Sequence, residues 1–228
     1  MRHYFRTRAY DRVRRTLNPM FVRYAGGDSR PPLIEPRAVF PASQKIEESF
    51  DAIHDEIIRL TQKNRLVRYA DVDLKRAEEV SLDWKLYYIK FLGKYNDRAL
   101  VECPVITGLT RDIPAIRSVI IAALEPRVEL AAHSGPYAGI LRYHLGVKIP
   151  RVNPPSIRVA DRIYTWREGE SIVLDDFFEH EVYNKSDEIR IILMIDIYRP
   201  MNWLLTILNK LYLHGLSSRL ARHFLEKF

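Results

Sequence analysis

The sequence predicts a mainly β domain of the sandwich or barrel type, with helix-forming segments on either side of it. Three observations support this prediction. Short segments rich in β-branched and aromatic residues follow one another between residues 84 and 198. Gly, Pro, Asn or Asp separates most of them, which favours a sandwich or barrel over a parallel sheet. Clear helical spacing of apolar residues is confined to the regions before residue 63 and after residue 200.

The first segment, residues 1–45, is expected to be a basic extension followed by a linker. Helical spacing over 1–21 is carried by Tyr10, Val13, Leu17 and Phe21. Pro19 is expected to limit how far this helix runs, because proline lacks a backbone N–H. Residues 24–44 contain Gly26-Gly27 and four prolines, which is typical of a linker that wraps the domain.

The main domain is expected over residues 46–200. It opens with an amphipathic helix over 46–62, where Ile46, Phe50, Ile53, Ile57 and Leu60 share one face. Strands are expected at 84–91, 116–124, 138–147, 156–160, 163–166, 171–175, 181–184 and 189–198. Hairpin turns are expected at Ala160-Asp161 and Glu168-Gly169.

The last segment, residues 201–228, is expected to form a basic amphipathic helix. Its apolar stripe is predicted from Leu204, Ile207, Leu208 and Leu211. Packing of this stripe against the barrel is one expectation, and contact with a membrane surface is the other.

Composition limits the classes of function. The chain has 228 residues, 47% of them apolar, and no apolar run approaches the ~18–20 residues of a membrane span. The arginine-rich start lacks the apolar stretch of a secretory signal. Cys103 is the single cysteine, which excludes an intramolecular disulfide. The expected location is therefore the cytoplasm.

The net charge of +7 is concentrated at the two ends. Residues 1–37 hold nine arginines against three acidic residues, a net charge of +6, and residues 201–228 carry +3. The middle of the chain is left with −2. This distribution argues against a nucleic-acid groove through the domain and favours contact of the basic ends with a partner or the inner face of a membrane. The alternative is that the basic ends only aid solubility.

Five residues of the β-rich region have side chains suited to a metal ion and an acidic ligand. In the strand around Arg142 and His144, alternation places both side chains on one face, with Leu141, Tyr143 and Leu145 on the other. That face is either a solvent face or an anion-binding interior. His133 and His180 lie on either side of this strand in the sequence, and Arg190 opens an apolar strand ten residues after His180.

These residue types suggest an iron site beside a dicarboxylate. Imidazoles suit first-row divalent metals, and two histidines with one carboxylate and open positions mark non-haem iron oxygenases. A guanidinium fork matches a carboxylate, so a buried Arg190 requires an acidic partner. His180 is expected just before a strand, and a hairpin is expected to place it and Arg190 on neighbouring strands. Gly135 stands where many iron oxygenases have aspartate.

The ordered motifs resemble the aspartyl/asparaginyl β-hydroxylase family over about residues 82–200. They are His133-Ser134-Gly135-Pro136, Leu141-Arg142-Tyr143-His144-Leu145-Gly146, Trp166-Arg167-Glu168-Gly169-Glu170, Asp175-Asp176-Phe177-Phe178-Glu179-His180-Glu181-Val182, Arg190 and Asp196. The resemblance implies a double-stranded β-helix core, of the jelly-roll or cupin-like kind, and a dioxygenase that uses Fe(II), 2-oxoglutarate and O2, with ascorbate as a possible addition.

The same resemblance implies a role for each site residue. His133 and His180 would bind the iron and thereby act as the catalytic residues. Arg190 would hold the far carboxylate of 2-oxoglutarate, with Arg142 and His144 assisting. Gly135 fits, because the animal protein hydroxylases of the family also have glycine there. A family serine that contacts the co-substrate corresponds to Ala122 in this chain.

A second branch, the bacterial lipid A acyl-chain hydroxylases, is also similar. The likeness lies in Tyr88-Ile89-Lys90-Phe91, Cys103-Pro104, Tyr137-Ala138-Gly139 and Arg199-Pro200. That branch usually has aspartate at the position of Gly135 and an N-terminal membrane anchor, and this sequence is expected to have neither.

The expected function is hydroxylation of an unactivated carbon, either the β-carbon of an Asp or Asn residue in a protein or peptide, or an acyl chain of a membrane lipid. Two alternatives remain open. One is a halogenase, in which chloride takes the iron position opened by Gly135. The other is a non-catalytic β-barrel binding module that acts through its basic ends.

Overall fold

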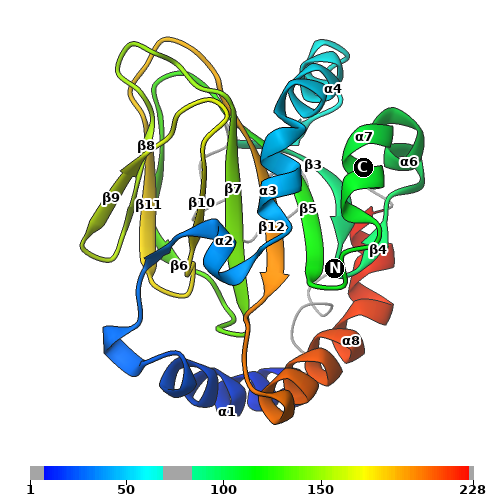
Figure 1. The fold of residues 1–228 in the computed structure, drawn as a ribbon, viewed down its shortest axis with the longest axis vertical. Helices are drawn as coiled ribbons and strands as arrows, with labels where there is room; N and C mark the ends of the chain where they lie inside the picture. Colours follow the sequence, from blue (N-terminus) through cyan, green and yellow to red (C-terminus); the bar gives the residue numbers. More distant parts are fainter. Residues whose placement is uncertain (1–7, 69–83, 226–228) are drawn as a thin grey trace.

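A computed structural model describes residues 8–68 and 84–225, and its centre is a barrel of two antiparallel sheets (Figure 1). The larger sheet has the spatial order β1 (Leu33–Ile34), β10 (Ser171–Leu174), β7 (Ile140–Lys148), β12 (Arg190–Tyr198), β5 (Ile116–Leu124), β3 (Trp84–Phe91) and β2 (Val67–Arg68), with β4 (Lys94–Tyr95) beside β3. The smaller sheet has the order β6 (Val128–Ser134), β11 (Glu179–Asn184), β8 (Ser156–Val159) and β9 (Arg162–Thr165).

From β5 to β12 the chain winds between the two sheets. Strands β5, β7, β10 and β12 belong to the larger sheet, whereas β6, β8, β9 and β11 belong to the smaller one. This winding is that of a double-stranded β-helix, the jelly-roll arrangement of cupins. The predicted fold class, with helices on either side of the core, is confirmed.

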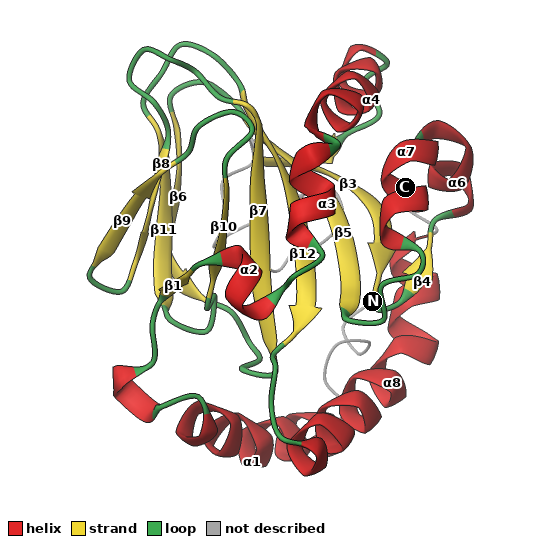
Figure 2. Ribbon diagram, viewed as in Figure 1, coloured by secondary structure: helices red, strands yellow, loops and turns green. Residues whose placement is uncertain are grey.

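The larger sheet is buried on both faces, which explains the continuous apolar runs in β5 and β12. Its inner face packs against the smaller sheet. Its outer face is covered by helices, as Figure 2 shows: α2 (Pro36–Val39), α3 (Ser43–Glu48), α4 (Phe50–Gln62), α6 (Asp97–Glu102) and α7 (Pro104–Thr110). The predicted helix over 46–62 is divided into α3 and α4, because Ser49 leaves helical geometry with a ψ of 15°.

The N-terminal segment differs from the prediction in two ways. Helix α1 (Arg8–Tyr24) continues through Pro19. Phe21 beyond the proline is fully buried, and this packing offsets the cost of proline in a helix. The predicted linker is also structured, because it contains the 3-10 helix η1 (Gly27–Ser29), α2 and β1, and Leu33 of β1 pairs with Leu174 of β10. Residues 1–7 of the predicted basic segment lie outside the described residues.

Helix α8 (Trp203–Leu225) forms where the last helix is predicted, but the predicted stripe is wrong in its packing. The side chains that face the domain are Leu205, Asn209 and Leu213, with Leu208 partly buried. Leu204, Ile207 and Leu211 are exposed instead. Helices α1 and α8 lie together at one end of the barrel (Figure 1). In the part of the chain that is described, no helix has the length and apolarity needed to cross a bilayer.

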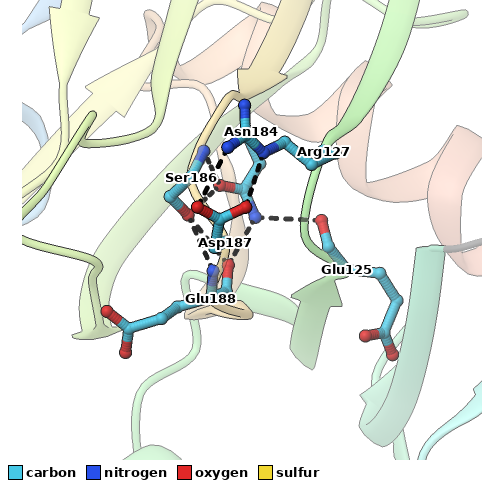
Figure 3. Close-up of polar contacts among 6 residues, drawn as sticks. All are labelled: Glu125, Arg127, Asn184, Ser186, Asp187 and Glu188. Carbon is cyan, nitrogen blue, oxygen red and sulfur yellow. Dashed lines mark hydrogen bonds and ion pairs between the residues drawn. The ribbon is translucent and has the colours of Figure 1, made fainter.

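A polar network ties two turns together at the start of β12 (Figure 3). The side chain of Asn184 donates hydrogen bonds to the backbone carbonyls of Leu124, Glu125 and Glu188, at 2.9–3.2 Å. Its own carbonyl accepts a hydrogen bond from Ser186 Oγ at 2.6 Å. The turn between β5 and β6 is thereby fixed to the turn between β11 and β12 (Figure 3).

Candidate active site

His133 and His180 lie opposite each other on paired strands. They are partners in the register between β6 and β11, and their ring centroids are 4.3 Å apart. The prediction that His180 lies just before a strand is wrong, because β11 already begins at Glu179. Strand β6 is not predicted by the sequence, since Val128 is its one β-branched residue and it has no Phe, Tyr or Trp.

Both imidazoles are oriented by the same local contact. His133 Nδ1 lies 2.7 Å from the carbonyl oxygen of Ala131, and His180 Nδ1 lies 2.9 Å from that of Phe178. A carbonyl only accepts, so Nδ1 carries the proton and Nε2 keeps its lone pair. Burial lowers the pKa of His180 to about 4, with a further contribution from nearby positive groups. A neutral imidazole with a free Nε2 is the form that binds a metal.

The turn before β11 is held by two arginines. Asp175 is fully buried, accepts a hydrogen bond from Arg30 Nε at 2.8 Å and forms an ion pair with Arg199 Nη2 at 2.8 Å. The Arg30 guanidinium also lies 3.7 Å from the ring centroid of Phe178. Arg30 therefore links the segment predicted to be a linker to the turn that positions His180.

Arg190 is a buried cation without a described partner for two of its nitrogens. Its predicted hairpin with His180 is wrong, because β11 and β12 belong to different sheets. The side chain is 2% exposed, its guanidinium carbon lies 4.8 Å from the ring of Trp166, and Nε and Nη1 have no hydrogen-bond partner among the described residues. Burial lowers the pKa of Arg190 to about 9. An anion is the partner that such a group lacks.

His144 shares this interior. It is buried on the inner face of β7, whereas Tyr143 and Leu145 pack on the outer face, so the predicted alternation is confirmed. Neither ring nitrogen of His144 has a partner among the described residues, and the same holds for Trp166 Nε1. Burial, followed by the charges of Arg142 and Arg190, holds the pKa of His144 well below its usual value. Several buried polar groups in this interior therefore lack a hydrogen-bond partner among the described residues, and a bound ligand would supply one.

Arg142 is held between two carboxylates. Its Nε donates to Asp196 Oδ1 at 2.7 Å on the neighbouring strand β12, and its Nη1 lies 3.3 Å from Asp176 Oδ2. The side chain therefore already has acidic partners, in contrast to Arg190. Asp176 is buried, which raises its pKa to about 6 despite the nearby Arg142.

Asp176 also explains the glycine at position 135. The Gly135 N–H donates to the Asp176 carbonyl at 2.6 Å, and a Cβ built on Gly135 would lie 2.8 Å from both the carboxyl carbon and Oδ2 of Asp176. A side chain at position 135 therefore has no room. Asp176 stands in the motif before His180, but its residue type alone indicates no role, and the packing against Gly135 is the signal that identifies it.

The residues present fit an iron ion held by two histidines. Among the described residues, no group of three His, Cys, Asp or Glu side chains is placed to hold a metal. The two oriented imidazoles would be its protein ligands, and Arg190 with His144 would suit an acidic co-substrate. Ala122, where the resemblance implies a serine in other members, is buried against the same interior.

A cavity of about 530 Å³ lies between the segment 28–33, the turn between β8 and β9, and the residues before β11. Its lining includes Arg30, Leu33, Arg162 and Phe178. Phe178 is two residues from His180 and provides the carbonyl that orients it. Phe178 is thus the residue that the cavity lining shares with the surroundings of the site, and neither His133 nor His180 lines the cavity.

Comparison with known proteins shows to which family this chain belongs. A family model described as aspartyl/asparaginyl beta-hydroxylase matches residues 47–200, which is more than half of the chain. This chain belongs to that family. The match contains the paired histidines, Arg142, His144 and Arg190, so the predicted resemblance is confirmed.

Two curated members of this hydroxylase family differ in their named substrates. The ornithine lipid ester-linked acyl 2-hydroxylase of Rhizobium tropici is 31% identical over 175 residues, which are 75% of this chain and 62% of that protein. The aspartyl/asparaginyl beta-hydroxylase of Homo sapiens is 28% identical over 163 residues, 69% of this chain and 21% of that protein. The chain thus matches less than two thirds of the length of either relative.

Partial likeness to solved structures is also found. The cupin domain of Schizosaccharomyces pombe Cnp3 has 7% identity and a TM-score of 0.35, covering 52% of this chain and 67% of that one. A predicted oxalate decarboxylase of Thermotoga maritima has 10% identity and a TM-score of 0.32, covering 50% of this chain and 80% of that one.

Proposed function

We propose that this member of the β-hydroxylase family is an Fe(II)- and 2-oxoglutarate-dependent hydroxylase. The observation that supports this most strongly is a combination of two features in the barrel. Two facing histidines each have Nδ1 directed at a backbone carbonyl, and the buried Arg190 has two nitrogens without a hydrogen-bond partner among the described residues. His133 and His180 would hold the iron. When bound, iron and 2-oxoglutarate would supply the oxidising chemistry that places an oxygen atom from O2 on a carbon.

The other residues of the barrel would bind and orient the co-substrate. Arg190 would pair with its far carboxylate, and the Trp166 ring beside the guanidinium holds the arginine in place. His144 offers a nearby polar group for the same anion. The buried side chains of Leu130, Val182, Ile192 and Met194 line the interior and exclude water, which strengthens each electrostatic contact there.

The proposed substrate is the acyl chain of a membrane lipid. The match to the ornithine lipid acyl 2-hydroxylase supports this choice, because it covers 75% of the chain at 31% identity. The second candidate is an Asp or Asn side chain of a protein or peptide, which the match to the human relative supports.

The reaction is tested by release of succinate from 2-oxoglutarate by the iron-loaded protein. We expect His133→Ala and His180→Ala to abolish this release, whereas His54→Ala, at a partly exposed histidine on α4, leaves it unchanged. Normal turnover in the two site variants would refute the proposal. Absence of both iron binding and a visible charge-transfer band with 2-oxoglutarate would favour the binding module.

The substrate is tested by mass spectrometry of lipid extracts and peptides from cells with and without the gene. A gain of one oxygen atom confined to an acyl chain is expected. The same gain confined to Asp or Asn residues would identify the second candidate. Chlorinated product that forms only when chloride is present would instead identify a halogenase.

A further inference from the structure

The outward faces of α1 and α8 are apolar, although nothing in the described structure covers them. On α1, Val13, Met20 and Tyr24 are exposed by 41–48% and lie on one side of the helix. The rest of the helix packs inward through Leu17 and Phe21. The exposed residues therefore form the outer margin of the same apolar stripe whose inner margin, Leu17 and Phe21, holds α1 to the domain.

Helix α8 also exposes apolar side chains, on the side opposite to the one that packs on the domain. Trp203, Leu204, Ile207 and Leu211 recur at helical spacing on its outer side, and Trp203 is 74% and Leu211 66% exposed. Its inner side packs through Leu205 and Leu213. The helix is therefore apolar on both sides, which tertiary packing inside this domain does not require.

Positive charge surrounds these apolar residues. Helix α1 contains five arginines and one acidic residue, Asp11, which pairs with Arg14. Helix α8 contains three basic residues and no Asp or Glu. The two helices together carry a net charge of +7, equal to that of the whole chain. Arg12, Arg15, Arg23 and Lys210 are exposed beside the apolar residues.

Both helices are attached to the loop that follows the first site histidine. Asn18 of α1 donates to the Pro136 carbonyl and accepts from the Ala138 N–H, each at 3.1 Å. Asn209 of α8 accepts a hydrogen bond from Tyr137 at 2.8 Å and donates to the Gly139 carbonyl at 2.6 Å. A partner that binds α1 and α8 would therefore also lie close to the end of the barrel that contains His133.

We propose that this docking face binds the surface of an anionic lipid bilayer. The docking face consists of Val13, Met20, Tyr24, Trp203, Leu204, Ile207 and Leu211 with the flanking basic residues Arg12, Arg15, Arg23 and Lys210. Helices with an apolar side containing tryptophan and flanking arginines lie in the bilayer interface, apolar side inward. The basic residues add attraction to anionic lipid headgroups. Exposure of these seven apolar side chains to water is unfavourable, and no contact among the described residues offsets this cost.

The docking face also places the cavity near the bilayer. The cavity lining begins at Asp28, four residues after α1 ends at Tyr24, and reaches Phe178 beside the histidine pair. An acyl chain would then reach the barrel without crossing bulk water. The inference goes beyond the proposed reaction, and its test requires no turnover, so either proposal can fail without the other.

The test is cosedimentation of the full chain with vesicles. Wild-type protein is expected to bind vesicles of phosphatidylcholine with phosphatidylglycerol more tightly than vesicles of phosphatidylcholine alone. The Leu204→Glu/Ile207→Glu variant is expected to lose binding by about tenfold or more. The Arg12→Gln/Arg15→Gln/Arg23→Gln variant is expected to lose the preference for anionic vesicles.

The matched control is Val152→Glu/Ile163→Glu, which adds the same charge at two exposed apolar residues outside the docking face. It is expected to bind vesicles as the wild type does. Thermal unfolding of each variant checks that it is folded, since all substituted residues are exposed. Quenching of fluorescence by brominated acyl chains is expected in the wild type and reduced in Trp203→Phe.

Three results would overturn the proposal. The first is absence of binding of the wild type to the anionic vesicles. The second is equal binding by the wild type and Leu204→Glu/Ile207→Glu. The third is a dimer in light scattering that this variant abolishes while vesicles are not bound, which would make the docking face a protein interface.

Discussion

Asn184 and Arg190 are six residues apart and nearly equally buried, yet their polar groups have opposite surroundings. The Asn184 amide donates to three backbone carbonyls, of which those of Glu125 and Glu188 are drawn in Figure 3, and its oxygen accepts from Ser186. Two nitrogens of Arg190 have no partner among the described residues. An amide with all its hydrogen bonds is tolerated inside a protein, whereas an unpaired buried charge is costly. The hydrogen bonds of Asn184 thus stabilise the fold. The burial of Arg190 is explained by the binding of an anionic ligand.

The largest expected effect is that of Arg190→Met on turnover. We expect kcat/KM for 2-oxoglutarate to fall by about a hundredfold or more, because the co-substrate loses a charge-assisted pairing of its far carboxylate. The free energy of unfolding is expected not to decrease, since an unpaired buried charge is removed. Succinate release and urea unfolding measure the two quantities. Unchanged turnover, or a clear loss of stability, would make Arg190 structural like Asn184.

The next effect is stabilisation by the co-substrate itself. With manganese(II) as a redox-inactive substitute for iron, 2-oxoglutarate at about a hundred times its Kd should raise the free energy of unfolding by about 2.7 kcal/mol. The same rise is expected in Asn184→Ala and not in Arg190→Met. Thermal unfolding with and without 2-oxoglutarate checks this. An equal rise in the free energy of unfolding of both variants would show that Arg190 does not bind the co-substrate.

Asn184→Ala tests the other side of the comparison. We expect the free energy of unfolding to fall by about 2–3 kcal/mol, because three carbonyls lose their donor and Ser186 loses an acceptor. The folded fraction should retain the wild-type KM for 2-oxoglutarate. Urea unfolding and steady-state kinetics measure both. A raised KM with an unchanged free energy of unfolding would show that Asn184 acts on co-substrate binding and not on the stability of the fold.

The smallest effect is expected at the edge of the same network. Arg127 forms a bidentate pair with Asp187 at 2.7 and 2.9 Å, but their side chains are 61% and 80% exposed. Arg127→Ala should lower the free energy of unfolding by less than about 1 kcal/mol, because water screens the pair. Urea unfolding at low and high salt checks this. A loss as large as that of Asn184→Ala would show that the turn depends on its surface pair.

The sequence predicted the features that depend on residue alternation and composition. The inner placement of His144 and the outer placement of Tyr143 follow from the period of a strand. Strand β6 was missed because pairing with β11, rather than its own composition, forms it. The break at Ser49 was missed because the apolar residues on either side of it keep one helical spacing. Neither feature is contained in a local sequence pattern.

The site was predicted as a set of residue types but not in its arrangement. The sequence indicated His133, His180 and Arg190, whereas the assignment of β11 and β12 to different sheets required the topology. The carboxylates beside Arg142 were not foreseen, because Asp176 and Asp196 come from distant parts of the chain. Helix α8 is apolar on both sides, so its pattern alone did not determine which side packs.

The contact between Gly135 and Asp176 restricts the evolutionary routes open to this chain. Gly135→Asp alone would introduce the carboxylate common in other iron oxygenases, but its Cβ would collide with the carboxyl group of Asp176. Asp176→Gly alone would leave Arg142 with one carboxylate, that of Asp196. Removing the Asp176 carboxyl group as well would not open this route, because the Asp176 backbone carbonyl lies equally close to the same Cβ, at 2.8 Å. A change between the two kinds of iron site therefore requires a shift of the backbone at this turn, and side-chain replacement alone does not achieve it.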